Sequence, residues 1–223
     1  MPVSRDLLKS FLQGYCAARA GKCRRTTGKD YGFFSEYEDG MMRSAEHFIL
    51  EGGVLDESSL RSGEWVTFFG KQPDLFDESK FLHLANEYMM KADIAGLYRS
   101  DGDMDLTWLK SNDEIDIFNR SGVFPSFDPS EEAFLFAFKK DDAYVATARY
   151  GTAGKGFIVV DRVGTLDCYK RQGLASRLLA AIVAHASLRD IKTALLVSTV
   201  EGEPLYLKAG FEHVAQVKVF SVN

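Results

Sequence analysis

Residues 165–179 read Thr165-Leu-Asp-Cys-Tyr-Lys-Arg-Gln-Gly-Leu-Ala-Ser-Arg-Leu-Leu179, a strand that breaks into a loop and at once begins a helix. The first amides of a helix have no internal acceptor, and the helix dipole adds partial positive charge there. Gly173 lets the backbone approach a ligand closely, Ala175 leaves the first turn open, and Lys170 and Arg171 add positive charge. The pattern suits a pyrophosphate. Taken alone, it fits an ordinary strand-to-helix connection equally well.

The elements around this stretch follow a definite order. Two β-rich runs at 134–138 and 144–150, joined by a polar turn, predict an antiparallel hairpin. Residues 191–198 include a continuous apolar run, typical of a strand covered on both faces. The order β-α-β-β-β-α-β-α-β describes a mixed sheet and excludes a doubly wound fold or a barrel. Its strands are expected at 105–109, 134–138, 144–150, 157–166, 191–198 and 211–221, and its helices at 113–119, at 173–188 and from Pro204 to Gly210.

The first hundred residues carry weaker signals. Leu7, Leu8, Phe11, Leu12 and Tyr15 recur at helical spacing, which predicts a helix over 4–20. A basic loop is expected at 22–29, strands at 31–35, 47–50 and 65–69, and a helix at 78–91. The polar, turn-rich segment 98–105 predicts a boundary between an N-terminal α/β lobe, residues 1–100, and a second domain, residues 101–223.

Composition narrows the class of protein. A chain of 223 residues that is 46% hydrophobic, with five prolines, has the composition of a globular protein. Its net charge of −5 argues against nucleic-acid binding, which draws on clustered positive charge. The longest apolar run, 178–184, falls far short of the roughly 20 residues of a membrane helix, and no signal peptide is expected. Three cysteines without metal-ligand spacing favour free thiols in the cytoplasm.

Several motifs for other chemistries fail. Residues 101–105 imitate the start of a calcium loop, but Leu106 replaces the turn glycine and Asn112 the final glutamate. The four histidines are scattered without an HExxH pattern, which favours satisfied surface or core residues over metal ligands. The Gly-x-Ser-x-Gly elbow of serine hydrolases is missing from the sequence. No metal is expected.

With its neighbours, the quoted stretch resembles the GNAT superfamily of acetyl-CoA-dependent N-acyltransferases. That family carries Gln/Arg-x-x-Gly-x-Gly/Ala at the start of a helix, where this chain reads Lys170-Arg-Gln-Gly-Leu-Ala175. Lys170 departs mildly from the pattern, and Asp167 replaces a proline that many members have. Downstream, Leu205-Tyr-Leu-Lys-Ala-Gly-Phe211 matches the family's Leu-Tyr-x-x-x-Gly-Phe ending. The resemblance covers about residues 102–223 and implies a mostly antiparallel sheet flanked by helices; the first lobe faintly looks like a degenerate copy.

The resemblance implies acetyl-CoA as cosubstrate and assigns a role to each matching position. Tyr206 matches the tyrosine that protonates the departing thiolate in many relatives; the other interpretation is a packing aromatic. Cys168 is not needed as a nucleophile. Main-chain groups of Val163, Gly164 and Thr165 are expected to bind the pantetheine arm, and the amides of Arg171, Gln172, Gly173, Leu174, Ala175 and Ser176 the pyrophosphate.

Two functions stay open at this point. One is an N-acetyltransferase acting by direct attack of a primary amine, from a small molecule or a peptide; the other is a non-catalytic acyl-CoA-binding or regulatory module. The general base is unassigned, because 191–198 holds no carboxylate; Asp161 and a water chain are the candidates. We expect the N-terminal lobe to supply part of the acceptor site, the alternative being a lobe that only stabilises the fold or a homodimer. Neither nucleic acid nor membrane is an expected partner.

Overall fold

The computed structural model describes residues 3–19, 23–29, 32–37, 43–74, 76–97, 106–154 and 156–223. Within them, eleven strands form one continuous sheet in the order β1-β2-β3-β4-β11-β5-β10-β9-β8-β7-β6. The α-helices are α1 (Arg5–Ala18), α2 (Asn112–Ser121), α3 (Leu174–Ser187) and α4 (Glu203–Ala209), and the strands are β1 (Cys23–Lys29), β2 (Gly32–Tyr37), β3 (Ala45–Leu50), β4 (Trp65–Phe69), β5 (Phe81–Asp93), β6 (Leu106–Leu109), β7 (Ala133–Lys140), β8 (Ala143–Ala153), β9 (Phe157–Thr165), β10 (Thr193–Thr199) and β11 (Glu212–Val222).

The sheet is mixed and mostly antiparallel, as the sequence predicts. Among the described strands, only the neighbours β3–β4 and β9–β10 run parallel. From β6 onward, the element order is the predicted β-α-β-β-β-α-β-α-β. The expected fold class is therefore confirmed.

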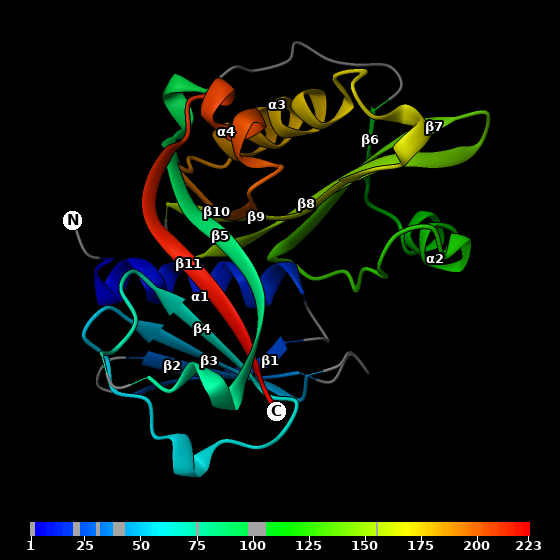
Figure 1. The fold of residues 1–223 in the computed structure, drawn as a ribbon. Helices are drawn as coiled ribbons and strands as arrows, with labels where there is room; N and C mark the ends of the chain where they lie inside the picture. The colour runs from blue at the N-terminus through cyan, green and yellow to red at the C-terminus, as the bar shows by residue number, and fades with distance from the viewer. Residues whose placement is uncertain are drawn as a thin grey trace.

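Two long strands join the halves of the chain. β11, the last strand, lies between β4 and β5, and β5 lies between β11 and β10. Figure 1 shows β5 and β11 running side by side from the region of α3 and α4 down to the strands of the N-terminal part. The boundary expected at residues 98–105, and the calcium-loop imitation at 101–105, lie outside the described residues. A fragment 101–223 would lack the β4 and β5 partners of its own strands β10 and β11, so tests belong on the full chain.

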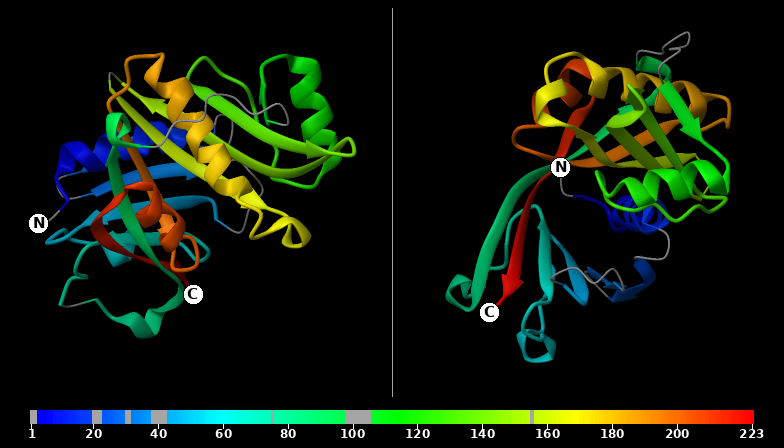
Figure 2. Two further views of the ribbon diagram at one scale, coloured as in Figure 1. Left: turned by 90° about the horizontal axis from the view of Figure 1, so that it is seen from above. Right: turned by 90° about the vertical axis from the view of Figure 1, so that its right-hand side faces the viewer.

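Helices from both halves cover the second half's strands. α3 contacts β7, β8 and β9, and α1 contacts β8 and β9. The right-hand view of Figure 2 places the two helices on opposite sides of these strands. Side chains along β9 alternate accordingly, since Ile158 and Val160 join the core under α3 while Val159 joins the core under α1. The N-terminal helix is therefore part of the second half's core.

The α1 backbone sits directly on β8. A Cβ atom on Gly151 would lie 2.1 Å from the Gly14 carbonyl oxygen and 2.4 Å from the Ala18 nitrogen. A Cβ on Gly14 would lie 2.6 Å from Cγ2 of Val159. Only glycines permit this approach, because interiors packed this densely have no room for an added methyl group.

Gly151→Ala is expected to lower the free energy of unfolding by about 3 kcal/mol, the upper end for overpacking a core. Backbone atoms of α1 occupy the space that the methyl group needs. Urea denaturation measures the change. Gly96→Ala is the matched control, because a Cβ there meets nothing within 4 Å. Equal unfolding midpoints for the two variants would contradict the close approach.

Two expected elements of the N-terminal part are wrong. Residues 78–91 form no α-helix: they pass from a short 3-10 turn into strand β5, Phe81–Asp93. Leu, Ala, Met, Glu and Lys favour a helix, but pairing with β10 and β11 on both sides of β5 overrides that preference. The basic loop expected at 22–29 is strand β1, Cys23–Lys29.

The cysteines agree only in part with the expected free thiols. Cys168 is free and exposed, but Cys16 is disulfide-bonded.

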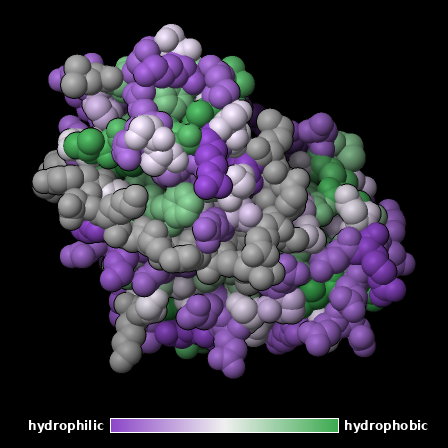
Figure 3. Space-filling view, turned by 90° about the horizontal axis from the view of Figure 1, so that it is seen from below, coloured by the Kyte–Doolittle hydropathy of each residue, from purple (hydrophilic) through white to green (hydrophobic). Residues whose placement is uncertain are grey.

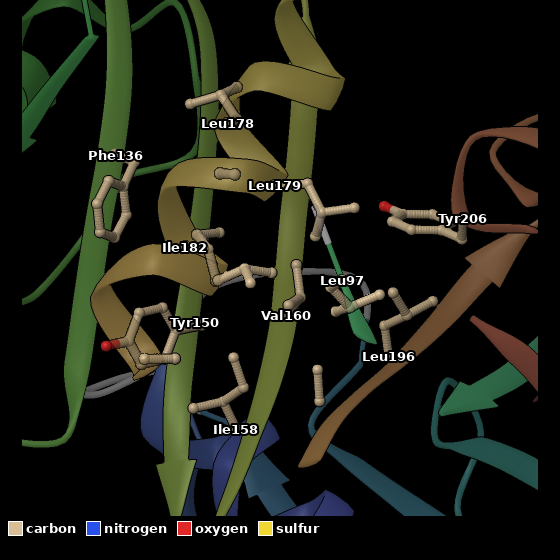
Figure 4. Packing of buried hydrophobic residues seen from close by; sticks show 14 of the residues in the cluster. Leu97, Phe136, Tyr150, Ile158, Val160, Leu178, Leu179, Ile182, Leu196 and Tyr206 are labelled. Atoms are coloured by element: carbon tan, nitrogen blue, oxygen red, sulfur yellow. The ribbon is translucent and has the colours of Figure 1, made fainter. Parts of the chain in front are cut away.

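The core under α3 contains a satisfied histidine. Figure 4 shows Leu178 and Ile182 of α3 facing Phe136 and Tyr150 of the sheet. His185 Nδ1 lies 2.5 Å from the buried Tyr150 hydroxyl. Burial, and then the positive charge of nearby Arg189, lower the pKa of His185 to about 4. His185 is thus a neutral, half-buried and hydrogen-bonded residue, which agrees with the expected satisfied surface or core histidine.

The coloured surface of the molecule seen from below is mainly polar (Figure 3). Seen from below in Figure 3, hydrophilic side chains make up most of the coloured surface, and hydrophobic ones form small separate areas. The large apolar side chains that are exposed, such as Val54, Leu82 and Leu188, come from different elements. No helix in the described part of the chain is long and apolar enough to cross a membrane.

Candidate functional site

The parallel strands β9 and β10 diverge after three paired residues. Phe157, Ile158 and Val159 pair with Thr193–Leu195. In the described residues, β9 then pairs with β8 alone and β10 with β5 alone. The edge of β9 from Val160 onward therefore offers backbone N–H and C=O groups that its former neighbour does not satisfy, and such groups need partners.

A β-bulge lies at this opening. The register between β8 and β9 shifts between the pair Thr147–Gly164 and the pair Arg149–Asp161. Arg162, inside the bulge, has a φ of 52°, which non-glycine residues rarely adopt. Bulges redirect side chains and cluster at functional sites, where the surroundings hold the strain. No pattern in the sequence indicates this bulge.

A cavity of about 520 Å³ opens beside the bulge. Its lining residues come from both halves of the chain: from α1, β3, β4 and β5, and from β9, β10, β11 and Tyr206 of α4. Aromatic and aliphatic side chains form much of the wall, Phe11, Phe48 and Phe69 among them. Six charged residues line it: Arg19, Arg43, Glu46, Glu87, Asp161 and Arg162. An apolar pocket with a few convergent polar groups is the usual form of a small-molecule site.

Tyr206 stands where the cavity meets the core under α3. Its helix α4 has proline at its start and ends at Gly210, whose φ of 103° suits the expected glycine stop. Tyr206 is 8% exposed, and Figure 4 shows its hydroxyl at the end of the ring nearest Leu179 of α3. Burial raises the pKa of Tyr206, so the phenol keeps its proton at neutral pH.

Asp161 does not suit the role of a general base. Arg19, the C-cap residue of α1, donates two hydrogen bonds of 3.0 and 3.1 Å to it, and Arg149 Nε donates a third of 3.0 Å. Burial alone would raise the pKa of Asp161, but Arg19 and Arg149 hold it well below its usual range. The carboxylate instead ties α1 to β8 and β9.

The cavity's other two carboxylates differ in their partners. Glu46 accepts hydrogen bonds from Tyr37 at 3.0 Å and from Thr67 at 2.5 Å. The carboxylate of Glu87 on β5, by contrast, has no hydrogen bond or ion pair among the described residues. Burial, and then the charge of Glu46, raise the pKa of Glu87. A carboxylate with a raised pKa is better matched to taking up protons near neutral pH.

Glu87 is not among the predicted site residues, because the sequence of residues 78–91 favours a helix of the N-terminal lobe. As a strand next to β10, β5 brings Glu87 opposite Thr199, beside the opening of the sheet. Alternation of apolar and polar residues over 81–93 was the one sequence signal that could have indicated a strand, and with it the position of Glu87. The strand's burial pattern is irregular, so that signal was weak.

The residues expected to hold the cosubstrate occupy two places. Val163, Gly164 and Thr165 lie on the stretch of β9 that β10 leaves unpaired, and Val163 lines the cavity together with Tyr206. The other six, Arg171, Gln172, Gly173, Leu174, Ala175 and Ser176, form the loop and first turn of α3 and do not line the cavity.

The loop before α3 has the predicted form. Gly173 is the N-cap of α3 with a φ of 79°, and a Cβ built on it would meet nothing within 4 Å. Arg171 also has a positive φ, 65°, and both residues are exposed. Lys170 is held by an exposed 2.6 Å ion pair to Asp167. The helix N-terminus is thus open to solvent. No group of side chains in the described residues could hold a metal ion.

Comparison with protein families matches residues 122–221 to the acetyltransferase (GNAT) domain. A solved GCN5-related N-acetyltransferase from Kribbella flavida is similar over 96% of this chain and 94% of its own, with a TM-score of 0.67 and 16% identity. A GCN5-related N-acetyltransferase-like protein from Streptococcus suis is similar over 94% and 92%, with a TM-score of 0.62 and 11% identity. No curated protein sequence matches the chain. At such identities, the solved structures show a shared fold.

Proposed function

The C-terminal half of the chain belongs to the GNAT superfamily, and on this premise we propose that the protein transfers an acetyl group from acetyl-CoA to a primary amine. The observation that carries the proposal is the divergence of β9 and β10. The strands diverge beside Tyr206 and beside a cavity that the unpaired carboxylate of Glu87 lines. A thioester between the strands would meet an amine in that cavity. The N-terminal lobe then supplies part of the acceptor site, since α1, β3, β4 and β5 line the cavity.

The residues present fit acetyl-CoA. On the β9 edge that faces β10, main-chain groups of Val163, Gly164 and Thr165 are free to bind an extended pantetheine arm, because β10 no longer pairs with β9 there. The first turn of α3 presents amides and an open glycine to a pyrophosphate. When bound, acetyl-CoA supplies an activated acyl group with a thiolate leaving group.

The chain's own groups then have defined tasks. The amine nitrogen forms a bond to the acetyl carbon, the carbon–sulfur bond breaks, and no covalent bond to the enzyme is needed. Glu87 takes the proton that the amine loses, and Tyr206 gives its phenolic proton to the departing sulfur and regains one from solvent. A β9 main-chain N–H stabilises the developing oxyanion, and holding the two reactants together supplies much of the remaining rate.

Release of free thiol from acetyl-CoA, measured with the full chain over a panel of amines, tests the proposal. We expect release that depends on both an amine and the enzyme. Binding of acetyl-CoA without thiol release from any amine would support the non-catalytic acyl-CoA-binding module instead. Absence of acetyl-CoA binding would contradict both functions.

Glu87→Gln is expected to lower kcat by about 10²-fold, the lower end for loss of a general base. In the parent protein, activity requires the ionised carboxylate, so the rate falls as the pH drops through the pKa of Glu87. Because that pKa is raised, the fall begins at a higher pH than an exposed glutamate would give. Glu87→Gln should lose this acid limb of the pH–rate profile. An unchanged profile would assign proton uptake elsewhere.

A further inference from the structure

Three buried donors in the described residues lack a hydrogen-bond partner: Arg43 Nε, Trp65 Nε1 and Arg162 Nε. All three residues line the same cavity, although they come from β4, β9 and the segment before β3. Each atom is a donor that cannot accept. Buried donors are nearly always satisfied, so three exceptions around one space indicate a ligand that brings acceptor oxygens.

Arg43 is held ready for such a ligand. It is 4% exposed, and its guanidinium carbon lies 4.1 Å from the Tyr37 ring centre and 4.3 Å from that of Trp65. Its Nη2 donates to the Tyr15 hydroxyl at 3.4 Å. Its Nε lies 3.5 Å from Glu46 Oε2, an ion-pair contact without the geometry of a hydrogen bond. The group is therefore fixed in place with donor capacity left over.

Arg162 forms no ion pair among the described residues, although three carboxylates line the cavity. Asp161 is engaged by two arginines, Arg19 and Arg149, and Glu46 lies beside Arg43. Burial, and then the positive charge of Arg19, lower the pKa of Arg162. A guanidinium in these surroundings gains from any negative group that enters.

Building on the proposed function, we propose that the amine acceptor carries an anionic group, a carboxylate, which accepts hydrogen bonds from Arg162, Arg43 and Trp65. The apolar walls at Phe48 and Phe69 hold the body of the acceptor, and its amine lies toward Glu87. The acceptor class is thus an apolar amino acid rather than a simple amine. A phosphate offers similar oxygens, and the experiment separates the two.

Acetylation of matched acceptors by the full chain tests the class. The pairs are phenylalanine against phenethylamine, 5-aminopentanoate against pentylamine, and O-phosphoethanolamine against ethanolamine. We expect the better carboxylate acceptor to exceed the matching amine without a carboxylate at least tenfold in kcat/KM, with no such preference in the phosphate pair. A preference for phosphate alone, or equal rates within all pairs, would overturn the proposal.

Substitutions of the proposed anion-binding residues test whether those residues cause the carboxylate preference. Arg162→Gln and Arg43→Lys should each reduce the carboxylate preference while leaving the KM for acetyl-CoA unchanged. Arg120→Gln, an exposed arginine of α2, should keep the preference. A rise in the acetyl-CoA KM in Arg162→Gln or Arg43→Lys, with the preference intact, would assign the donors to the coenzyme and overturn the proposal. Thermal unfolding establishes that each variant is folded, and Trp65→Phe replaces any that is not.

Binding separates this proposal from the enzymatic one. Calorimetry with N-acetylphenylalanine and with its primary amide needs no turnover. Binding of the acid at least tenfold tighter than the amide, lost in Arg162→Gln, would support the anion site even if no amine is acetylated. Equal binding of acid and amide, or binding of neither, would overturn it even if simple amines are acetylated.

Discussion

Gly173→Glu is expected to abolish acetyl-CoA binding in a folded protein, a loss of at least about 100-fold in affinity. Gly173 caps α3 at the point where the helix dipole favours an anion. A side chain built there starts in open space, so the new carboxylate occupies and repels the pyrophosphate position without disturbing the core. Isothermal titration calorimetry with acetyl-CoA measures the effect.

Gly122→Glu is the matched control. Gly122 ends α2 with a φ of 62° and a ψ of 6°, close to the 79° and 4° of Gly173. A Cβ at Gly122 also meets nothing within 4 Å. Because the backbone angles and the surrounding space are alike, both variants carry similar backbone strain and the same added charge. Normal affinity in Gly122→Glu is expected. Normal affinity in Gly173→Glu would remove the coenzyme from this loop.

Tyr206→Phe is expected to lower kcat by about 10²–10⁴-fold, the range for loss of a general acid. The ring and its packing stay, so the affinity for acetyl-CoA should not change. Steady-state kinetics with the best amine, together with calorimetry, give the two numbers. Tyr144→Phe is the control, because this buried tyrosine packs with α2 residues and donates weakly, at 3.5 Å, to the Glu114 carbonyl. Parent-like turnover in Tyr206→Phe would make Tyr206 a packing residue.

In the second half of the chain, local sequence signals determine the secondary-structure elements. Gly173 marks the start of α3, Pro204 and Gly210 bracket α4, and the turn before residue 143 sets the β7–β8 hairpin. Each signal acts within a few residues of the element it defines. For this reason the order of elements after residue 105 was predictable.

The first half depends on contacts between distant residues. β5 is rich in residues that favour a helix, and its pairing with β10 and β11 makes it a strand. The cavity arises because α1 lies on β8 and β9 through Gly14 and Gly151, and because Arg19 reaches Asp161, 142 residues away. Neither the proposed base Glu87 nor the donors of Arg43 and Trp65 could be placed in the cavity before those contacts were known.

A crystal structure of the full chain with acetyl-CoA tests the central claim most directly. We predict the thioester between the diverging ends of β9 and β10, its carbonyl oxygen accepting from a β9 main-chain N–H. The pyrophosphate should lie on the amides of residues 171–176, with the acetyl group directed into the cavity beside Tyr206 and Glu87. Acetyl-CoA bound away from β9, or an acetyl group directed away from that cavity, would contradict the account.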